Sequence, residues 1–122
     1  RLGLVGLGGL EQRAPGQLSG GQRKRASLAR ATILDPELIA CDEPTAGLDP
    51  VVAAGIDDML LRFRELLGST LVVVSHELVS IHAVASRAIM LEAGRVRATG
   101  PVDLLARSAD PVVHAFFHAR EA

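Results

Sequence analysis

Two short stretches decide the fold, Leu18-Ser19-Gly20-Gly21-Gln22 and then Leu38-Ile39-Ala40-Cys41-Asp42-Glu43. In the first, paired glycines let the backbone approach a ligand closely, and the start of a helix after them favours an anion such as a phosphate. Taken alone, these five residues are equally consistent with an ordinary capped helix start. The second stretch is an apolar run that ends in two carboxylates, which is typical of a buried strand with a polar tip.

Helices and strands alternate outward from these stretches. Ser19 and Gln22 match a capping box and predict a helix over 21–34, which Asp35-Pro36 ends. The apolar run 38–41 predicts a strand buried on both faces. A helix over 50–67 follows, with Asp49 as its cap and Gly68 at its end. Residues 1–17, with several glycines, predict a short helix or loop.

The second half of the chain continues this alternation. A second buried strand, apolar and β-branched, is predicted over 70–74, and a short helix over 75–85. A hairpin over 88–91 and 95–99 turns at Ala93-Gly94, and Pro101 and Asp110-Pro111 open two last short helices. The pattern predicts an α/β fold with a mostly parallel sheet flanked by helices.

Polar residues follow both predicted parallel strands. Asp42-Glu43 ends the first and Ser75-His76 ends the second. Ligands of parallel sheets bind at the carboxyl ends of strands, so these side chains are expected at one edge. Asp42 suits a Mg²⁺ shell, and Glu43 suits orientation or deprotonation of an attacking water. A solvated turn would also place carboxylates there, and a lone histidine at a strand end is usually structural.

Three other groups have a simpler interpretation. Asp49 is expected to cap a helix, which is compatible with a role across a subunit interface. His114 and His118 have the spacing of a metal pair, but no third ligand is evident, so metal binding is not favoured. Arg23, Lys24, Arg25 and Arg30 are interpreted as the solvated face of a basic helix, with nucleic-acid contact as the less favoured alternative.

Composition limits the remaining function classes. The chain has 122 residues and a net charge of -1, so bulk charge favours neither nucleic acid nor an anionic membrane. Phenylalanine is the only aromatic type, which argues against a base-stacking surface. Cys41 has no partner for an internal disulfide. No run approaches the roughly 20 apolar residues of a membrane span. The high apolar content and the start at Arg1 lead us to expect a fragment whose faces are covered elsewhere.

In order and spacing, four motifs resemble the C-terminal half of an ABC-type ATPase domain. Residues 18–22 are similar to its signature motif, 38–43 to its Walker B strand, 46–49 to its D-loop, and Ser75-His76 to its switch histidine. A narrower resemblance, carried by 23–31 and 110–117, is to ATP-binding subunits of Mla-type lipid (organic-solvent tolerance) transporters. Residues 1–122 are then expected to form the C-terminal part of one partial P-loop NTPase domain.

The resemblance implies a role for each motif. Ser19, Gly20, Gly21 and Gln22 would bind the γ-phosphate of ATP held by a second ATPase subunit. Asp42 would act on Mg²⁺ through water, Glu43 would be the catalytic base, His76 would contact the γ-phosphate, and Asp49 would communicate across the dimer. Transmembrane permease subunits would be the other partners, and the subunit would lie on the cytoplasmic face of the membrane without inserting into it. Nucleic acid is not expected as a partner.

One half of the ATP site has no match in the chain. Lys24 is the only lysine, and it lies in Arg23-Lys24-Arg25, not in a G-x-x-x-x-G-K-[ST] loop. The adenine-stacking aromatic and the glutamine that senses the permease are also missing. This chain alone is therefore expected neither to bind ATP tightly nor to hydrolyse it. The alternatives are a non-transport ABC ATPase that acts on DNA or ribosomes, and an inactive remnant. Phe116-Phe117 is a candidate dimer contact.

Overall fold

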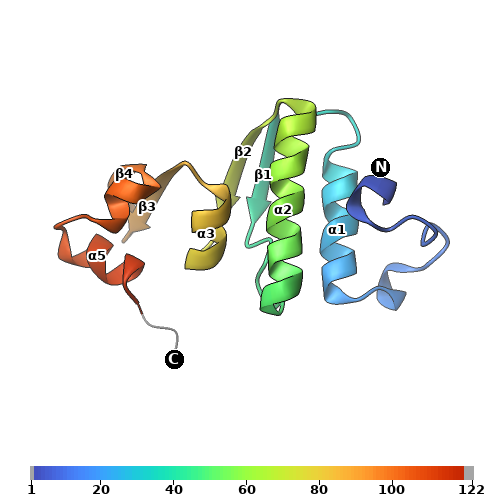
Figure 1. Ribbon diagram of the computed structural model, residues 1–122, viewed down its shortest axis with the longest axis horizontal. Helices are drawn as coiled ribbons and strands as arrows, with labels where there is room; N and C mark the ends of the chain where they lie inside the picture. Colours follow the sequence, from blue (N-terminus) through green and yellow to red (C-terminus); the bar gives the residue numbers. More distant parts are fainter. Residues whose placement is uncertain (1, 120–122) are drawn as a thin grey trace.

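The computed structural model describes residues 2–119 (Figure 1). In chain order the elements are η1 (Leu2–Val5), η2 (Pro15–Gln17), α1 (Gly20–Ala31), β1 (Leu38–Asp42), α2 (Pro50–Leu67), β2 (Thr70–Val74), α3 (Leu78–Val84), β3 (Arg87–Glu92), β4 (Arg95–Pro101), α4 (Val102–Ala106) and α5 (Pro111–Phe117). The predicted α/β alternation is confirmed.

β1 and β2 form a parallel pair whose register runs from Leu38 opposite Thr70 to Asp42 opposite Val74. α1 and α2 run beside this pair, and both helices begin at the end where the two strands finish (Figure 1). The core lies between these elements and η1. Its buried members are Val5, Leu7, Leu28, Ala29, Ile39, Ile56, Met59, Leu60 and Phe63. This core fixes the strand tips relative to the first turns of both helices.

Most of the predicted helix boundaries hold. The Ser19 hydroxyl accepts from Gln22 N–H, the Asp49 carboxylate accepts from Val52 N–H, and Gly68 ends α2 with φ of 65°. Two boundaries differ from the prediction by three residues. α1 ends at Ala31 instead of residue 34, and the Thr32 hydroxyl at its C-cap donates to Leu28 O and Ala29 O.

The other difference is the start of α3, which begins at residue 78 instead of 75. Ser75 Oγ accepts from the N–H of Glu77 at 3.1 Å and so forms a local turn in place of a helical one. This turn leaves residues 75–77 as a loop between β2 and α3. His76 lies in that loop.

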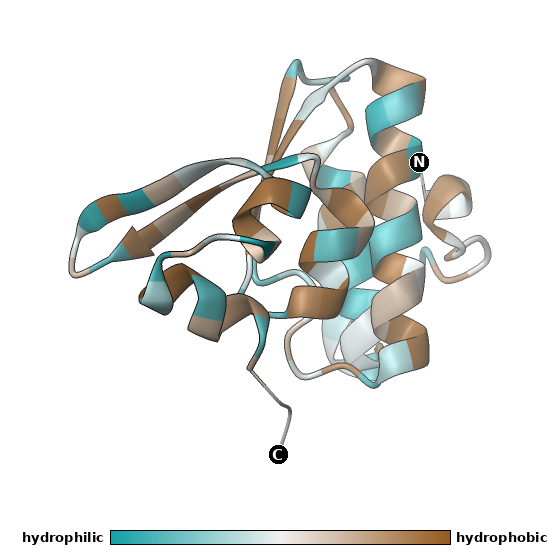
Figure 2. Cartoon of the chain, turned by 60° about the vertical axis from the view of Figure 1, so that its left-hand side comes forward, coloured by the Kyte–Doolittle hydropathy of each residue, from teal (hydrophilic) through white to brown (hydrophobic). Residues whose placement is uncertain are grey.

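The prediction that the first strand is buried on both faces is wrong for this chain. Along β1, Ile39 is buried while Leu38 and Ala40 are exposed, and on β2 the side chains of Val72 and Val74 are also exposed. The apolar character of both strands is visible in Figure 2. The helices cover only one face of the pair, so the alternating residues on the other face remain open.

β3 and β4 form a separate antiparallel hairpin. Its turn is the predicted Ala93-Gly94, where φ is 50° and 75°, as a two-residue hairpin turn with left-handed centres requires. Arg97 of β4 bonds to the carboxylate of Asp110, which also caps α5. Among the helices described within residues 2–119, none is both long enough and apolar enough to cross a bilayer.

Candidate functional site

The tips of β1 and β2 bring two predicted site residues into contact. Glu43 Oε1 lies 2.8 Å from His76 Nδ1. The prediction that polar groups after both strands meet at one edge is therefore confirmed. The His76 side chain is 72% exposed and that of Glu43 is 32% exposed. The hydrogen bond to Glu43, followed by the charge of that carboxylate, raises the pKa of His76 above its ordinary value.

The backbone of Glu43 is held in an uncommon conformation. Its φ is 48°, in the left-handed region that residues with a Cβ rarely occupy. Its N–H donates to Val74 O at 2.7 Å, which extends the strand ladder by one bond. Its carbonyl accepts from Lys24 Nζ at 2.9 Å and from Ala46 N–H at 3.3 Å. The turn after β1 thus aims the Glu43 side chain toward the tip of β2.

Oxygen ligands cluster at the same edge. Asp42 is exposed at the end of β1, and Glu43 Oε2 is buried without a hydrogen-bond partner in the described chain. One ligand atom each from Glu43, His76 and Glu77 lies within 4.8 Å of the others. Mg²⁺ is typically held by one or two carboxylates together with waters and phosphate oxygens. Asp42 is not in this converging group, but its exposed carboxylate at the end of β1 is of the type that could hold such an ion. Glu77 was not predicted, although it directly follows His76.

The glycine turn begins α1 and lies at the surface. Ser19 and Gly20 are exposed, whereas Gly21 is buried. The Ser19 hydroxyl and the Gln22 amide oxygen are used within the capping box, at 3.1 and 2.9 Å from the partner nitrogens. The first backbone hydrogen bond of α1 is donated by Arg23 N–H to Ser19 O. The N–H groups of Gly20 and Gly21 come before this bond and so have no acceptor within the helix ladder. These two N–H groups are the donors that a phosphate would meet.

The glycine turn also contacts the segment before α2. A Cβ added at Gly20 would lie 3.8 Å from Leu48 Cδ2, and one added at Gly21 would lie 2.7 Å from Val52 Cγ1. Gly21 is therefore required by the close approach of α1 and α2, which no local sequence pattern indicates. Asp49 lies between Leu48 and Val52 in the chain; it is exposed, and its carboxylate caps α2.

A buried polar network lies below the strand tips. Thr45, Ser80 and Asp57 are each at most 5% exposed. Ser80 Oγ is 3.0 Å from Thr45 Oγ1 and donates to Asp57 Oδ2 at 2.9 Å, while Asp57 Oδ1 has no partner in the described residues. Burial raises the pKa of Asp57, and the Ser80 hydroxyl partly offsets that rise. The network joins the Glu43 turn to α2 and α3. No sequence pattern indicated it.

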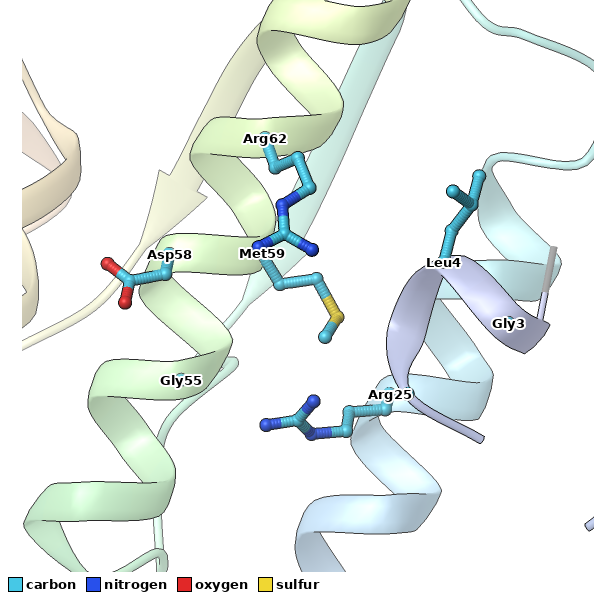
Figure 3. Close-up of a pocket in the computed structure, with 8 residues that line it drawn as sticks. Gly3, Leu4, Arg25, Gly55, Asp58, Met59 and Arg62 are labelled. Atoms are coloured by element: carbon cyan, nitrogen blue, oxygen red, sulfur yellow. The ribbon is translucent and has the colours of Figure 1, made fainter. Parts of the chain in front are cut away.

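The basic run 23–25 is not one solvated face. Arg23 is exposed, Lys24 reaches Glu43, and Arg25 Nη1 donates to Val5 O at 3.1 Å. Figure 3 shows Arg25 extending from α1 toward α2 in a pocket of about 290 Å³. The pocket is lined by Gly3, Leu4, Gly6, Arg25, Gly55, Asp58, Met59 and Arg62. None of these residues belongs to the predicted site.

His114 and His118 stack with ring centroids 4.0 Å apart. His118 Nδ1 also lies 2.9 Å from the His114 carbonyl, so one ring nitrogen is already engaged within the helix end. The pair is absent from the clusters of candidate metal ligands in residues 2–119.

The chain is similar in sequence to known ATP-binding proteins of ABC transporters. Residues 2–46 match the ABC transporter family. The chain is 42% identical over 120 residues to the "Probable ribonucleotide transport ATP-binding protein mkl" of Mycobacterium tuberculosis, covering 98% of this chain and 33% of that protein. It is 44% identical over 101 residues to the "Methionine import ATP-binding protein MetN" of Halalkalibacterium halodurans, covering 83% and 30%.

The fold is that of part of an ABC-type ATP-binding domain. Among solved structures, the ADP conformation of MJ1267, an ATP-binding cassette of an ABC transporter, superposes with a TM-score of 0.82 at 28% identity, covering 98% of this chain and 47% of that one. The cbiO1 structure from Clostridium perfringens, described as part of the ABC transporter complex cbiONQ, gives a TM-score of 0.79 at 25% identity and covers 97% and 47%. The chain thus spans about a third of the curated relatives and about half of these ATP-binding cassettes.

Proposed function

We propose that residues 1–122 form the C-terminal part of an ATP-hydrolysing domain in an ABC transporter ATP-binding subunit. The contact between Glu43 and His76 at two adjacent strand tips is the observation that carries this proposal. It places a carboxylate and an imidazole at the edge where parallel sheets bind ligands. ATP with Mg²⁺ is the proposed cofactor, and the whole protein is proposed to couple hydrolysis to transport.

In this proposal Glu43 is the general base. Its carboxylate orients the attacking water and accepts a proton from it, while His76 holds the carboxylate through Nδ1 and leaves its other ring nitrogen for the γ-phosphate. Asp42 would hold Mg²⁺, which would neutralise phosphate charge. Phosphoryl transfer depends mainly on such positioning and charge neutralisation.

The glycine turn serves a second nucleotide in the same proposal. The residues Ser19, Gly20, Gly21 and Gln22 bind the γ-phosphate of ATP held by a partner subunit. The exposure of Ser19 and Gly20 at the start of α1 supports this assignment, because a neighbouring molecule can reach them. Asp49, which lies in the chain between Leu48 and Val52, communicates across the dimer in addition to capping α2.

The partners and location follow from the same family. Two such subunits would associate with transmembrane permease subunits on the cytoplasmic face of the membrane. The Phe116-Phe117 pair, half-buried with centroids 5.4 Å apart, is proposed as a dimer contact. Phe117 also packs on His82 of α3 at 6.0 Å, so one ring already has a partner within the chain. If dimerisation of the complete protein is unchanged after deletion of 110–122, this contact is wrong.

A lipid or other hydrophobic compound is the proposed transport substrate. The support is the resemblance of 23–31 and 110–117 to Mla-type subunits. The relatives named above are described instead as ribonucleotide and methionine transport proteins. Permease complexes reconstituted in vesicles distinguish these classes. Stimulation of hydrolysis by phospholipid supports the proposal, and stimulation only by ribonucleotide or methionine contradicts it.

Phosphate release tests the proposed activity. The complete ATP-binding domain that contains this segment is expected to hydrolyse ATP with Mg²⁺ and to stop when EDTA removes the ion. The 122-residue chain is the matched control and is expected to release no phosphate. If the complete domain is inactive with its permease present, the proposed function is wrong. Co-purification with nucleic acid in place of a permease would indicate a non-transport ABC ATPase.

A further inference from the structure

The only lysine of the chain connects the helix after the glycine turn to the peptide of Glu43. Lys24 is half-buried on α1, and its Nζ donates to Glu43 O at 2.9 Å. The two residues are 19 positions apart. An ammonium group carries three donors and full charge, so its bond to a carbonyl is stronger than one between neutral groups.

The neighbours of Lys24 show that this contact is particular to its position. Arg23 is exposed, and Arg25 turns toward η1, where it bonds to Val5 O. Three consecutive basic side chains therefore have three different surroundings. Lys24 alone of the three reaches the strand tip, so a general basic helix face does not explain it.

The carbonyl that accepts from Lys24 belongs to Glu43, whose backbone conformation is strained. Glu43 has φ of 48°, and such a conformation persists only where its surroundings hold it. The bond from its N–H to Val74 O fixes one side of the residue, and the Lys24 and Ala46 donors fix the other. Ala46 lies in the same turn and moves with it. Lys24 is the donor that ties the turn to α1.

We propose that Lys24 is a positioning residue that holds the Glu43 peptide in its left-handed conformation and so keeps the carboxylate on His76. Through this bond α1 links the exposed Ser19-Gly20 turn at its start to the general base of the same subunit. The inference rests on the proposed function, since it assigns Lys24 a part in aiming the base for hydrolysis. It predicts a loss of turnover without loss of nucleotide binding.

The kinetic test uses the complete ATP-binding domain with three variants. Lys24→Met removes the donor but keeps the length of the side chain, and Lys24→Arg restores a charged donor. Arg23→Met is the matched control, because Arg23 is exposed on the same helix. We expect Lys24→Met to lower kcat on the order of tenfold, the effect of losing one charge-assisted hydrogen bond. We expect KM for ATP to stay unchanged, Lys24→Arg to recover most of kcat, and Arg23→Met to match the wild type.

A second readout does not depend on activity. Hydrogen exchange at the amides of Ala46 and Leu48, which bond within the turn, is expected to speed up in Lys24→Met and not in Arg23→Met. An active wild type whose kcat and exchange are both unchanged by Lys24→Met overturns the inference and leaves the proposed function standing. An equal loss of kcat in Lys24→Arg with normal exchange also overturns it. An inactive wild type overturns the proposed function, and with it the catalytic role of Lys24.

Discussion

Glu43 and His76 lie 33 positions apart in the chain, and their side chains meet at 2.8 Å. The parallel register places Asp42 opposite Val74, so the residues just beyond each strand emerge at the same edge. The left-handed turn at Glu43 then directs its carboxylate toward the second strand. Site geometry here is therefore a consequence of strand pairing together with one unusual backbone conformation.

Replacing the proposed base should separate binding from turnover. In the complete domain, Glu43→Gln removes the proton acceptor but keeps the size of the side chain, so we expect kcat to fall by about 100-fold or more. Binding of ATP should be retained, because the base does not hold the nucleotide. Phosphate release and equilibrium binding of ATP measure the two effects. Glu65→Gln, at an exposed position of α2, is the control. Normal hydrolysis by Glu43→Gln would show that another group is the base.

The contact between Glu43 and His76 should also raise the pKa of the His76 ring. Glu43 raises the pKa of His76, so the imidazolium persists above the ordinary value of about 6.5. Its contribution to stability is complete below that unfolded-state value and is lost as pH rises through the raised folded value. Titration of the His76 ring protons by NMR measures the pKa directly. Glu43→Gln should return it toward the ordinary value, and an unchanged titration would mean that the contact does not form in solution.

The buried carboxyl of Asp57 should reduce stability at neutral pH. Burial raises its pKa, so the folded state favours the protonated form and stability falls as pH rises from the ordinary aspartate value of about 3.9 through the folded value. Asp57→Asn keeps the shape and cannot ionise. We expect the melting temperature of Asp57→Asn to rise relative to that of the wild type as the pH increases through that range. Glu65→Gln, at an exposed position of the same helix, is the control and should show no such trend.

Local sequence signals predicted much of the fold. The caps at Ser19, Asp49 and Asp110, the stop at Gly68 and the turn at Ala93-Gly94 depend on short-range chemistry, and each is present. The end of α1 and the start of α3 were missed where Thr32 and Ser75 form local side-chain hydrogen bonds. Burial of the strands was missed because it depends on distant groups. An apolar strand does not reveal whether one face or both will be covered.

In the candidate site, too, some contacts could be predicted from the sequence and others could not. The meeting of Glu43 and His76 followed from strand order, which the sequence does indicate. The Lys24 contact and the network of Thr45, Ser80 and Asp57 join elements far apart in the chain, and ordinary surface residue types form them. These residues do not recur at a regular spacing in the sequence. Only the folded structure therefore shows that they are in contact.

Gly21 and Gly20 offer a matched pair for testing why the turn contains two glycines. A Cβ at Gly21 would lie 2.7 Å from Val52 Cγ1, a β-branched side chain with little freedom to move, so α1 and α2 must separate. We expect Gly21→Ala to lower the free energy of unfolding by about 1–3 kcal/mol, the usual cost of overpacking. At Gly20 the nearest atom is 3.8 Å away, and Gly20→Ala should leave stability unchanged. Chemical denaturation measures both variants. Adding Val52→Ala to Gly21→Ala should restore part of the loss, because it removes the clashing methyl group. Equal stability of the two single variants would show that close helix packing is not what requires glycine at position 21.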